Sequence, residues 1–185
     1  MYRQRIEGKD FTEDSFLIDE YEDCIFVDCN FDRQDWTKAV FIDCHFEYCN
    51  LSNVRLDQTA LKGVVFEHCK MLGLRFDYCN SALMKMEFSD CQLDHSIFVG
   101  MNLKKQIFND CRLRDVDFSE CNLSMSVFNN CDLDGTTFEF TDLRNADLST
   151  SFNFRIDPDQ NTIKNAKFSK DGLIGLLAKY DIFVE

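Results

Sequence analysis

The sequence is poor in the residues that build elaborate loops, because its 185 residues include one proline and seven glycines. It also lacks any apolar run near the roughly 18–20 residues that a membrane span needs. The first residues, MYRQRIEGKDF, contain no apolar run of the kind found in secretory signals. We therefore expect a cytoplasmic chain without a membrane segment.

An excess of basic residues is also missing. The formal net charge is −13, with acids spread over both halves of the chain. Such a field repels phosphate backbones and attracts basic protein surfaces. The composition therefore argues against direct nucleic-acid binding and favours a protein partner.

Motifs that carry catalytic or metal chemistry are absent. The ten cysteines include no C-x-x-C pair, and the histidines at 45, 68 and 95 have no partnered ligand pattern. No nucleophile motif, pair of catalytic carboxylates or glycine-rich phosphate loop appears. We expect no enzyme activity, no metal and no cofactor, and we expect the thiols to be reduced.

What the sequence does contain is a five-residue period. Two series of large apolar residues, which we call centres, run in steps of five from Phe11 to Phe76 and from Leu83 to Leu148. Each series has fourteen members without an exception. A period of five fits neither a helix nor an alternating strand, and it favours a coil that turns a corner every five residues.

All ten cysteines lie two residues before a centre position, nine of them before an apolar centre and Cys79 where the first register continues to Ser81. A residue in that position points to the same side of an extended segment as the centre does. We therefore expect the cysteines to lie inside as small packing residues, with Cys29, Cys49 and Cys69 in one column and Cys91, Cys111 and Cys131 in another.

Pentapeptides such as Cys111-Arg112-Leu113-Arg114-Asp115 and Ala146-Asp147-Leu148-Ser149-Thr150 resemble the A(D/N)LXX motif of pentapeptide-repeat proteins. The resemblance covers residues 11–150. It implies an all-β fold, a right-handed quadrilateral parallel β-helix with four pentapeptides in each coil. Twenty-eight centres then make seven coils, about 34 Å long at about 4.8 Å per stacked strand.

Residues twenty apart should stack in such a coil, and they sort into columns of one type. We expect a column of Phe98, Phe118 and Phe138 beside a column that contains Phe108 and Phe128, with these rings forming the repeat core. The step from Phe76 to Leu83 is seven, so Cys79–Leu83 reads as a two-residue insertion that bulges one corner.

The chain divides at residue 168 in this interpretation. Residues 1–168 form the β-helix, with regular repeats over 11–150 and an irregular eighth coil over 151–168, where Asn153 and Pro158 occupy centre positions. Residues 169–185 form a cap, with Ser169 at the start of a short helix and Ile182–Val184 as a possible strand.

The cap is more apolar than one coil end needs. Covering the last coil is its simplest role, and a dimer interface is the alternative. The resemblance implies the dimer, because a C-terminal helix joins two rods in relatives of this family. The dimerisation candidates are Leu173, Ile174, Leu176, Leu177, Tyr180 and Phe183.

Two functions remain open. The acidic rod and its tail resemble the topoisomerase-binding members of the family (Qnr, MfpA and McbG), which implies binding to DNA gyrase or topoisomerase IV in place of DNA and protection from quinolones or a toxin. The alternative is a structural, interaction or immunity protein with another protein partner.

A DNA mimic needs acids in stripes along the rod. Asp23 and Asp43 align twenty residues apart, as do Asp90 and Asp110, and these four are the candidate contact residues. Lys104, Lys105, Arg112 and Arg114 interrupt the acidic surface of the body.

Overall fold

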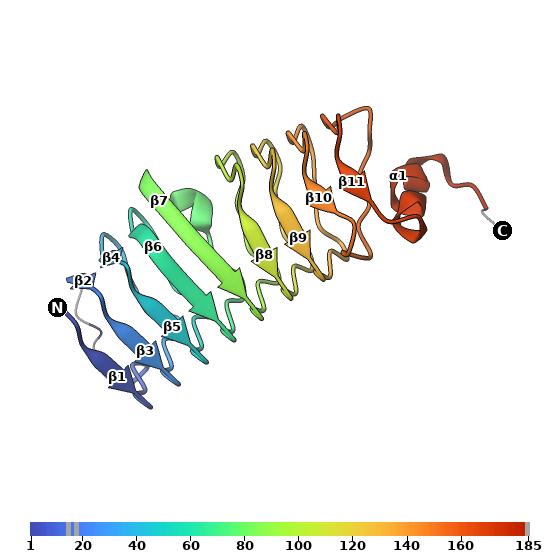
Figure 1. The fold of residues 1–185 in the computed structure, drawn as a ribbon. Helices are drawn as coiled ribbons and strands as arrows, with labels where there is room; N and C mark the ends of the chain where they lie inside the picture. The colour runs from blue at the N-terminus through green and yellow to red at the C-terminus, as the bar shows by residue number, and fades with distance from the viewer. Residues whose placement is uncertain (14–15, 17–18, 184–185) are drawn as a thin grey trace.

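The chain forms a straight rod with its two ends at opposite ends of the molecule (Figure 1). The computed structural model describes residues 1–13, 16 and 19–183. The rod is a right-handed quadrilateral parallel β-helix of about eight coils, closed by one short helix. The coil indicated by the five-residue period, and the quadrilateral β-helix implied by the resemblance to pentapeptide-repeat proteins, are confirmed.

Each corner of the coil is made by one residue with a left-handed backbone. In one coil these are Asp23, Asp28, Arg33 and Lys38, with φ between 50° and 66°. The corner N–H then donates to a carbonyl in the next coil, as from Asp23 to Ile42 at 3.0 Å. Left-handed φ turns the chain sharply and is tolerated best by Gly, Asn and Asp. The five-residue period is thus a short extended segment followed by a corner.

The strands are all parallel and pair with the equivalent segment of the next coil. The main path of the sheet runs through β1, β3, β5, β6, β7, β8, β9, β10 and β11, and β2 and β4 lie beside it (Figure 1). Their bounds are β1 Arg5–Glu7, β2 Glu20–Glu22, β3 Ile25–Val27, β4 Val40–Ile42, β5 His45–Glu47, β6 Ala60–Glu67, β7 Asn80–Ser89, β8 Ile107–Asn109, β9 Val127–Asn129, β10 Asp147–Leu148 and β11 Lys167–Phe168. A 3-10 helix, η1, covers Phe76–Tyr78.

We number the faces of the rod by the centres of one coil: face 1 contains Phe26, face 2 Phe31, face 3 Trp36 and face 4 Phe41. The sheet path just described is face 1. Each centre points into the rod, and the residues on either side of it point outward.

The core is a set of stacked rings. Phe118 lies between Phe98 and Phe138, with ring centroids 5.0 and 5.6 Å away, and Phe108 lies 5.1 Å from Phe128. These five rings are buried. Burying each one stabilises the fold by about 1.5–3 kcal/mol, and each ring also shields its neighbours in the adjacent coils. The repeat core predicted from the sequence is confirmed.

All ten cysteines are free and buried. Six of them form one column that crosses the insertion: Cys29, Cys49, Cys69, Cys91, Cys111 and Cys131. A Cys49 Sγ–H in this column points at the Phe26 carbonyl, 3.4 Å away in the preceding coil. The expectation that the cysteines are small inward packing residues is confirmed.

The insertion lies within β7. Ala60 pairs with Asn80, but Val64 pairs with Met86, so two extra residues enter between these pairs. Leu83 was predicted to be a buried centre, and this is wrong: it is 81% exposed and has a left-handed φ of 59°. The bulge lifts Leu83 off the rod, and the half-buried Met84 packs against the core in its place.

The coil begins before Phe11, where the regular repeats were expected to start. Strand β1 pairs with β3, and Ile6 lies over Phe26 in the register. At the other end, the centre positions of Asn153 and Pro158 are not filled by apolar side chains. Phe154 and Ile156 are buried there instead, and Phe168 returns to the register opposite Leu148.

The tail folds as a short helical segment against the last coil. It consists of η2 (Asp171–Leu173), α1 (Ile174–Leu177) and η3 (Ala178–Tyr180). Ser169 Oγ accepts a hydrogen bond from Gly172 N–H at 2.9 Å, as expected of a residue that caps a helix start. Residues 182 and 183 form no strand, and Val184 of the possible strand lies outside the described residues.

The helical segment at the C-terminal end of the rod is too short to span a membrane. Within residues 1–13, 16 and 19–183, no helix is both long and apolar enough to cross a bilayer.

Candidate protein-binding face

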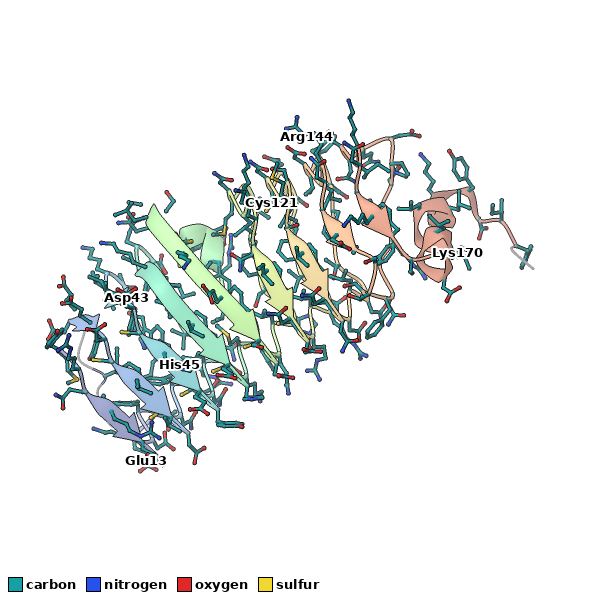
Figure 2. The ribbon with its side chains drawn as sticks, in the orientation of Figure 1. Glu13, Asp43, His45, Cys121, Arg144 and Lys170 are labelled. Atoms are coloured by element: carbon teal, nitrogen blue, oxygen red, sulfur yellow. The ribbon has the colours of Figure 1, made fainter. Side chains whose placement is uncertain are left out.

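The four candidate aspartates border one face of the rod. Asp23 and Asp43 are corner residues between faces 4 and 1, and Asp90 and Asp110 are corner residues between faces 1 and 2. Figure 2 labels Asp43 beside His45 of β5, which lies on face 1. The structure thus brings all four to face 1, although they form two lines rather than one.

The line that contains Asp90 and Asp110 continues toward the N-terminus. We define the acidic edge as the carboxylates at or beside the corner between faces 1 and 2. Its members are Glu7, Asp28, Glu47, Glu67, Asp90 and Asp110. Strand register places Glu47 opposite Glu67 in adjacent coils, so the edge advances by about one coil per step.

Few cations neutralise this edge. Glu7 pairs with Arg5, Nε to Oε2, at 3.1 Å. Among the described residues, no lysine or arginine nitrogen lies within 4.0 Å of a carboxylate oxygen of Asp28, Glu47, Asp90 or Asp110. The edge therefore presents net negative charge to solvent.

Two histidines stand between the acids of the edge. His45 Nε2 lies 3.3 Å from Glu67 Oε2, and His68 Nδ1 lies 3.7 Å from Asp90 Oδ2. The His68 ring also stacks on Tyr48, with centroids 4.6 Å apart. These contacts between adjacent coils restrict the positions of the side chains along the edge.

Two acids on the neighbouring face 2 are paired with arginines instead. Arg112 lies 2.5 Å from Asp94 Oδ2, and Arg114 lies 2.6 Å from Asp132 Oδ2. Burial acts to raise the pKa of Asp132, but hydrogen bonds from Asn153 and Arg114 outweigh it and lower that pKa. Arg112 and Arg114 thus neutralise Asp94 and Asp132 on face 2 rather than the carboxylates of the acidic edge.

Face 4 changes character along the rod. Its N-terminal part carries Glu20 and Glu22, and its C-terminal part carries Lys104 and Lys164 in the equivalent columns. Arg144 lies between these lysines and binds Asp142 at 2.6 Å, a hydrogen bond that lowers the pKa of Asp142. Face 4 is therefore acidic near the N-terminus and basic toward the C-terminus.

Asp23 and Asp43, the two candidates between faces 4 and 1, each have a close neighbour that limits their contact with a partner. Asp23 Oδ2 accepts from Arg3 Nε at 3.3 Å, which neutralises part of its charge. Asp43 packs over Gly63 of the next coil. We therefore regard Asp90 and Asp110 as the stronger contact residues.

Sequence reasoning missed four members of the acidic edge: Glu7, Asp28, Glu47 and Glu67. The signal was present, because a count of twenty back from Asp110 reaches Asp90, and a count of twenty-two across the insertion reaches His68. Two further steps of twenty reach Tyr48 and Asp28.

The dimerisation candidates separate into two groups. Leu176 is half-buried and packs against the core, so it holds the cap to the coil. The others are exposed, and Ile182 joins them at 56%: Leu173, Ile174, Leu177, Tyr180 and Phe183. The exposed group leaves apolar area of the cap uncovered.

A metal site is not formed by the residues that the structure describes. No three His, Cys, Asp or Glu side chains gather there closely enough to hold a metal ion. Cys44 and Cys121 lie outside the column of six cysteines. Burial raises the pKa of Cys44 to about 11 and that of Cys121 to about 12. These thiols are neutral packing groups at neutral pH.

Comparison with known proteins agrees with this geometry. A family model described as a pentapeptide repeat region matches residues 39–106 and 74–148, which together span more than half of the chain. No curated protein sequence matches the chain.

Three solved structures are similar to this chain. The first is a trypsin-treated variant of QnrB1, a plasmid-mediated fluoroquinolone resistance protein, with 18% identity, a TM-score of 0.52, and coverage of 100% of this chain and 99% of that one. Full-length QnrB1 gives 18% identity and a TM-score of 0.45, with 98% and 99% covered. HetL, from the cyanobacterium Nostoc sp. strain PCC 7120, gives 12% identity and a TM-score of 0.37, with 91% and 85% covered. The chain belongs to the pentapeptide-repeat family.

Proposed function

We propose that this protein is a non-catalytic binding rod that occupies the DNA-binding surface of DNA gyrase or topoisomerase IV, and thereby protects the enzyme from quinolones or a toxin. The observation that carries the proposal is the acidic edge, in which carboxylates without a lysine or arginine partner among the described residues follow one corner of face 1 from Asp28 to Asp110.

The spacing of the carboxylates along the acidic edge is of the same order as the spacing of phosphates along DNA. Stacked coils place one carboxylate about every 4.8 Å, while one strand of duplex DNA carries a phosphate about every 3.4 Å. The net charge of −13 compares with about 20 phosphate charges on a duplex of 34 Å. A basic groove that binds DNA would therefore attract this face, and the rod needs no ordering when it binds.

Dimerisation through the cap extends the same surface. The exposed residues Ile174, Leu177 and Phe183 would bury apolar area against a second copy. Two rods joined at their C-terminal ends double the length and the charge available to the partner. The likeness of fold to QnrB1, whose description names fluoroquinolone resistance, supports this choice of partner.

A second candidate is a different protein partner. The acidic edge ends at Asp110, where Asn130 Nδ2 donates to Asp110 Oδ1 at 2.7 Å, and Lys104, Lys105 and Lys164 follow on face 4. A pure DNA mimic has no need of this basic region. It favours an interaction or immunity protein that binds a partner of mixed charge.

Competition with DNA separates the two candidates. A fluorescently labelled duplex is bound to gyrase, the protein is titrated in, and the anisotropy of the duplex is followed. Displacement of the duplex supports the DNA mimic. Binding of the protein to gyrase without displacement, or no binding at all, contradicts it and leaves the second candidate.

A further inference from the structure

The two-residue insertion breaks the backbone hydrogen-bond ladder of face 4. On either side of it the ladder is regular: Asn80 N–H donates to Thr59 at 2.9 Å, and Asn122 N–H donates to Met101 at 3.0 Å. The equivalent N–H of Asn102 has no hydrogen-bond partner among the described residues. The segment that begins at Asn102 therefore lacks a hydrogen-bonded strand on the side of the preceding coil.

Two carbonyls on the same edge are also open. Asn122 accepts from Leu103 N–H at 2.9 Å, and Ser124 accepts from Lys105 N–H at 3.0 Å. No N–H within the described chain reaches the equivalent carbonyls of Asn102 and Lys104. Three adjacent backbone groups that the repeat would normally satisfy thus face solvent, and such an edge is a template for another strand.

A groove of about 650 Å³ lies beside this edge. Met84 and Met86 of β7 line one side, and Leu103 and Ile107 line the other. Ile107 is 46% exposed and Met84 is half-buried, so apolar surface remains open in the groove. The pairing of β7 with β8 begins only at Phe88, which leaves the earlier part of β7 separated from the next coil.

The face 4 end of the groove is basic. Lys85, Lys104 and Lys105 line it, and only Lys85 has an acidic partner among the described residues, Glu87 at 3.2 Å. Glu67, at the far end, contacts His45 and His68. The charge beside the open strand edge is thus positive on an otherwise acidic protein.

We propose that this groove binds an extended acidic segment of a partner protein, which pairs with the edge Asn102–Lys104 as an added strand. An extended backbone supplies the carbonyl and N–H groups that Asn102 and Lys104 lack. Alternate side chains of such a strand point into the groove, toward Met84 and Ile107, and its acids meet Lys104 and Lys105.

A polypeptide fits the groove better than a nucleic acid does. A nucleic acid has no row of alternating amide donors and acceptors, and a long one would be repelled by the net charge of −13. The groove meets the acidic edge at Glu67, but the open strand edge Asn102–Lys104 lies on face 4, so its pairing with a strand can be tested independently of the proposed binding to topoisomerases.

Binding of a short fluorescent peptide tests the proposal. The probe is fluorescein-labelled EVEVE, and the comparison probes are KVKVK and a ten-nucleotide oligo-dT. We expect saturable binding of EVEVE and none of KVKVK. In amide hydrogen exchange, Asn102 should exchange rapidly in the free protein and at least ~10-fold more slowly with EVEVE bound.

Two variants localise the binding. Deleting Ala82 and Leu83 restores the twenty-residue step, so it should close the ladder, protect the Asn102 amide and abolish EVEVE binding. K104E should weaken EVEVE about 10-fold, whereas K164E, on the same face but away from the groove, should leave it unchanged.

The proposal is overturned if EVEVE does not bind, if KVKVK binds as well, or if oligo-dT binds and EVEVE does not. Equal weakening by K104E and K164E would also overturn it, because only net charge would then matter. The comparison of K104E with K164E keeps the test decisive even if the deletion variant fails to fold.

Discussion

The carboxylate of Asp43 lies directly over the backbone of Gly63 in the next coil, so that a β-carbon added to Gly63 would stand 2.3 Å from Asp43 Oδ1. Asp115 and Gly135 repeat this relationship at another corner, also at 2.3 Å. Corner residues of adjacent coils are therefore packed against each other, and a glycine is required where the carboxylate reaches furthest.

Substitution of Gly63 by alanine should destabilise the protein more than substitution of Gly100. Both glycines have left-handed φ, +68° and +71°, so each alanine costs about 1 kcal/mol of conformational strain. At Gly100 nothing lies within 4 Å of the added carbon. At Gly63 the displacement of Asp43 should add about 1 kcal/mol. Urea denaturation of both variants measures the difference, and equal losses would show that the contact carries no energy.

Truncation of a ring inside the stack should be severe. Phe118→Ala removes a fully buried ring between two others and should lower the free energy of unfolding by about 3–5 kcal/mol. Phe140→Ala is the matched control, because that ring is 70% exposed, and its cost should stay within about 0.5 kcal/mol. Similar midpoints of denaturation for the two variants would contradict the inward stack.

The buried thiols predict a loss of stability in alkali. Burial raises the pKa of Cys44 from 9.0 to about 11. Between these values the thiol ionises in the unfolded chain but stays protonated in the folded one. The contribution of Cys44 is therefore complete below pH 9 and is lost as the pH rises toward 11, with a slope of up to about 1.4 kcal/mol per pH unit. Denaturation of the wild type and of Cys44→Ala from pH 8 to 11 should show a shallower fall for the variant.

The exposed face of the cap should hold a dimer together. Ile174→Asp places a charge on a residue that is 55% exposed, so the fold should tolerate it while the interface does not. Light scattering during size-exclusion chromatography should report a dimer for the wild type and a monomer for this variant. Lys170→Asp, a charge change just before the cap helix, is the control. A wild-type protein that remains monomeric at high concentration would exclude the dimer.

The regular part of the rod could be predicted from the sequence because its signal is repeated in every coil. A large centre such as Phe118 and a small residue two before it determine burial locally, and residues twenty apart confirm each other. Leu83 had no such confirmation. The count from Phe76 reveals two extra residues but not which ones leave the rod, and Leu83, Met84 and Met86 are all apolar.

The acidic edge was only half predicted for the same reason. The alignment of Asp90 with Asp110 follows from simple counting, whereas Asp28 is joined to them through Tyr48 and His68 and across a shifted register. Pairing is also invisible in a sequence, since nothing in the spacing shows that Arg114 neutralises Asp132 whereas, in the part of the chain that the structure describes, Asp90 pairs with His68 and with no arginine or lysine.

The most direct test of the central claim is DNA supercoiling by gyrase in the presence of a fluoroquinolone. The account predicts that the wild-type protein restores supercoiling and that the double variant Asp90→Asn and Asp110→Asn does so at least ~10-fold less well. The variant Glu120→Gln with Glu139→Gln removes the same charge away from face 1 and should protect as the wild type does. A protein truncated before Ser169 should fail if the dimer is required. No protection by the wild type at any concentration, or equal protection by the two double variants, would contradict the claim that face 1 binds gyrase in place of DNA.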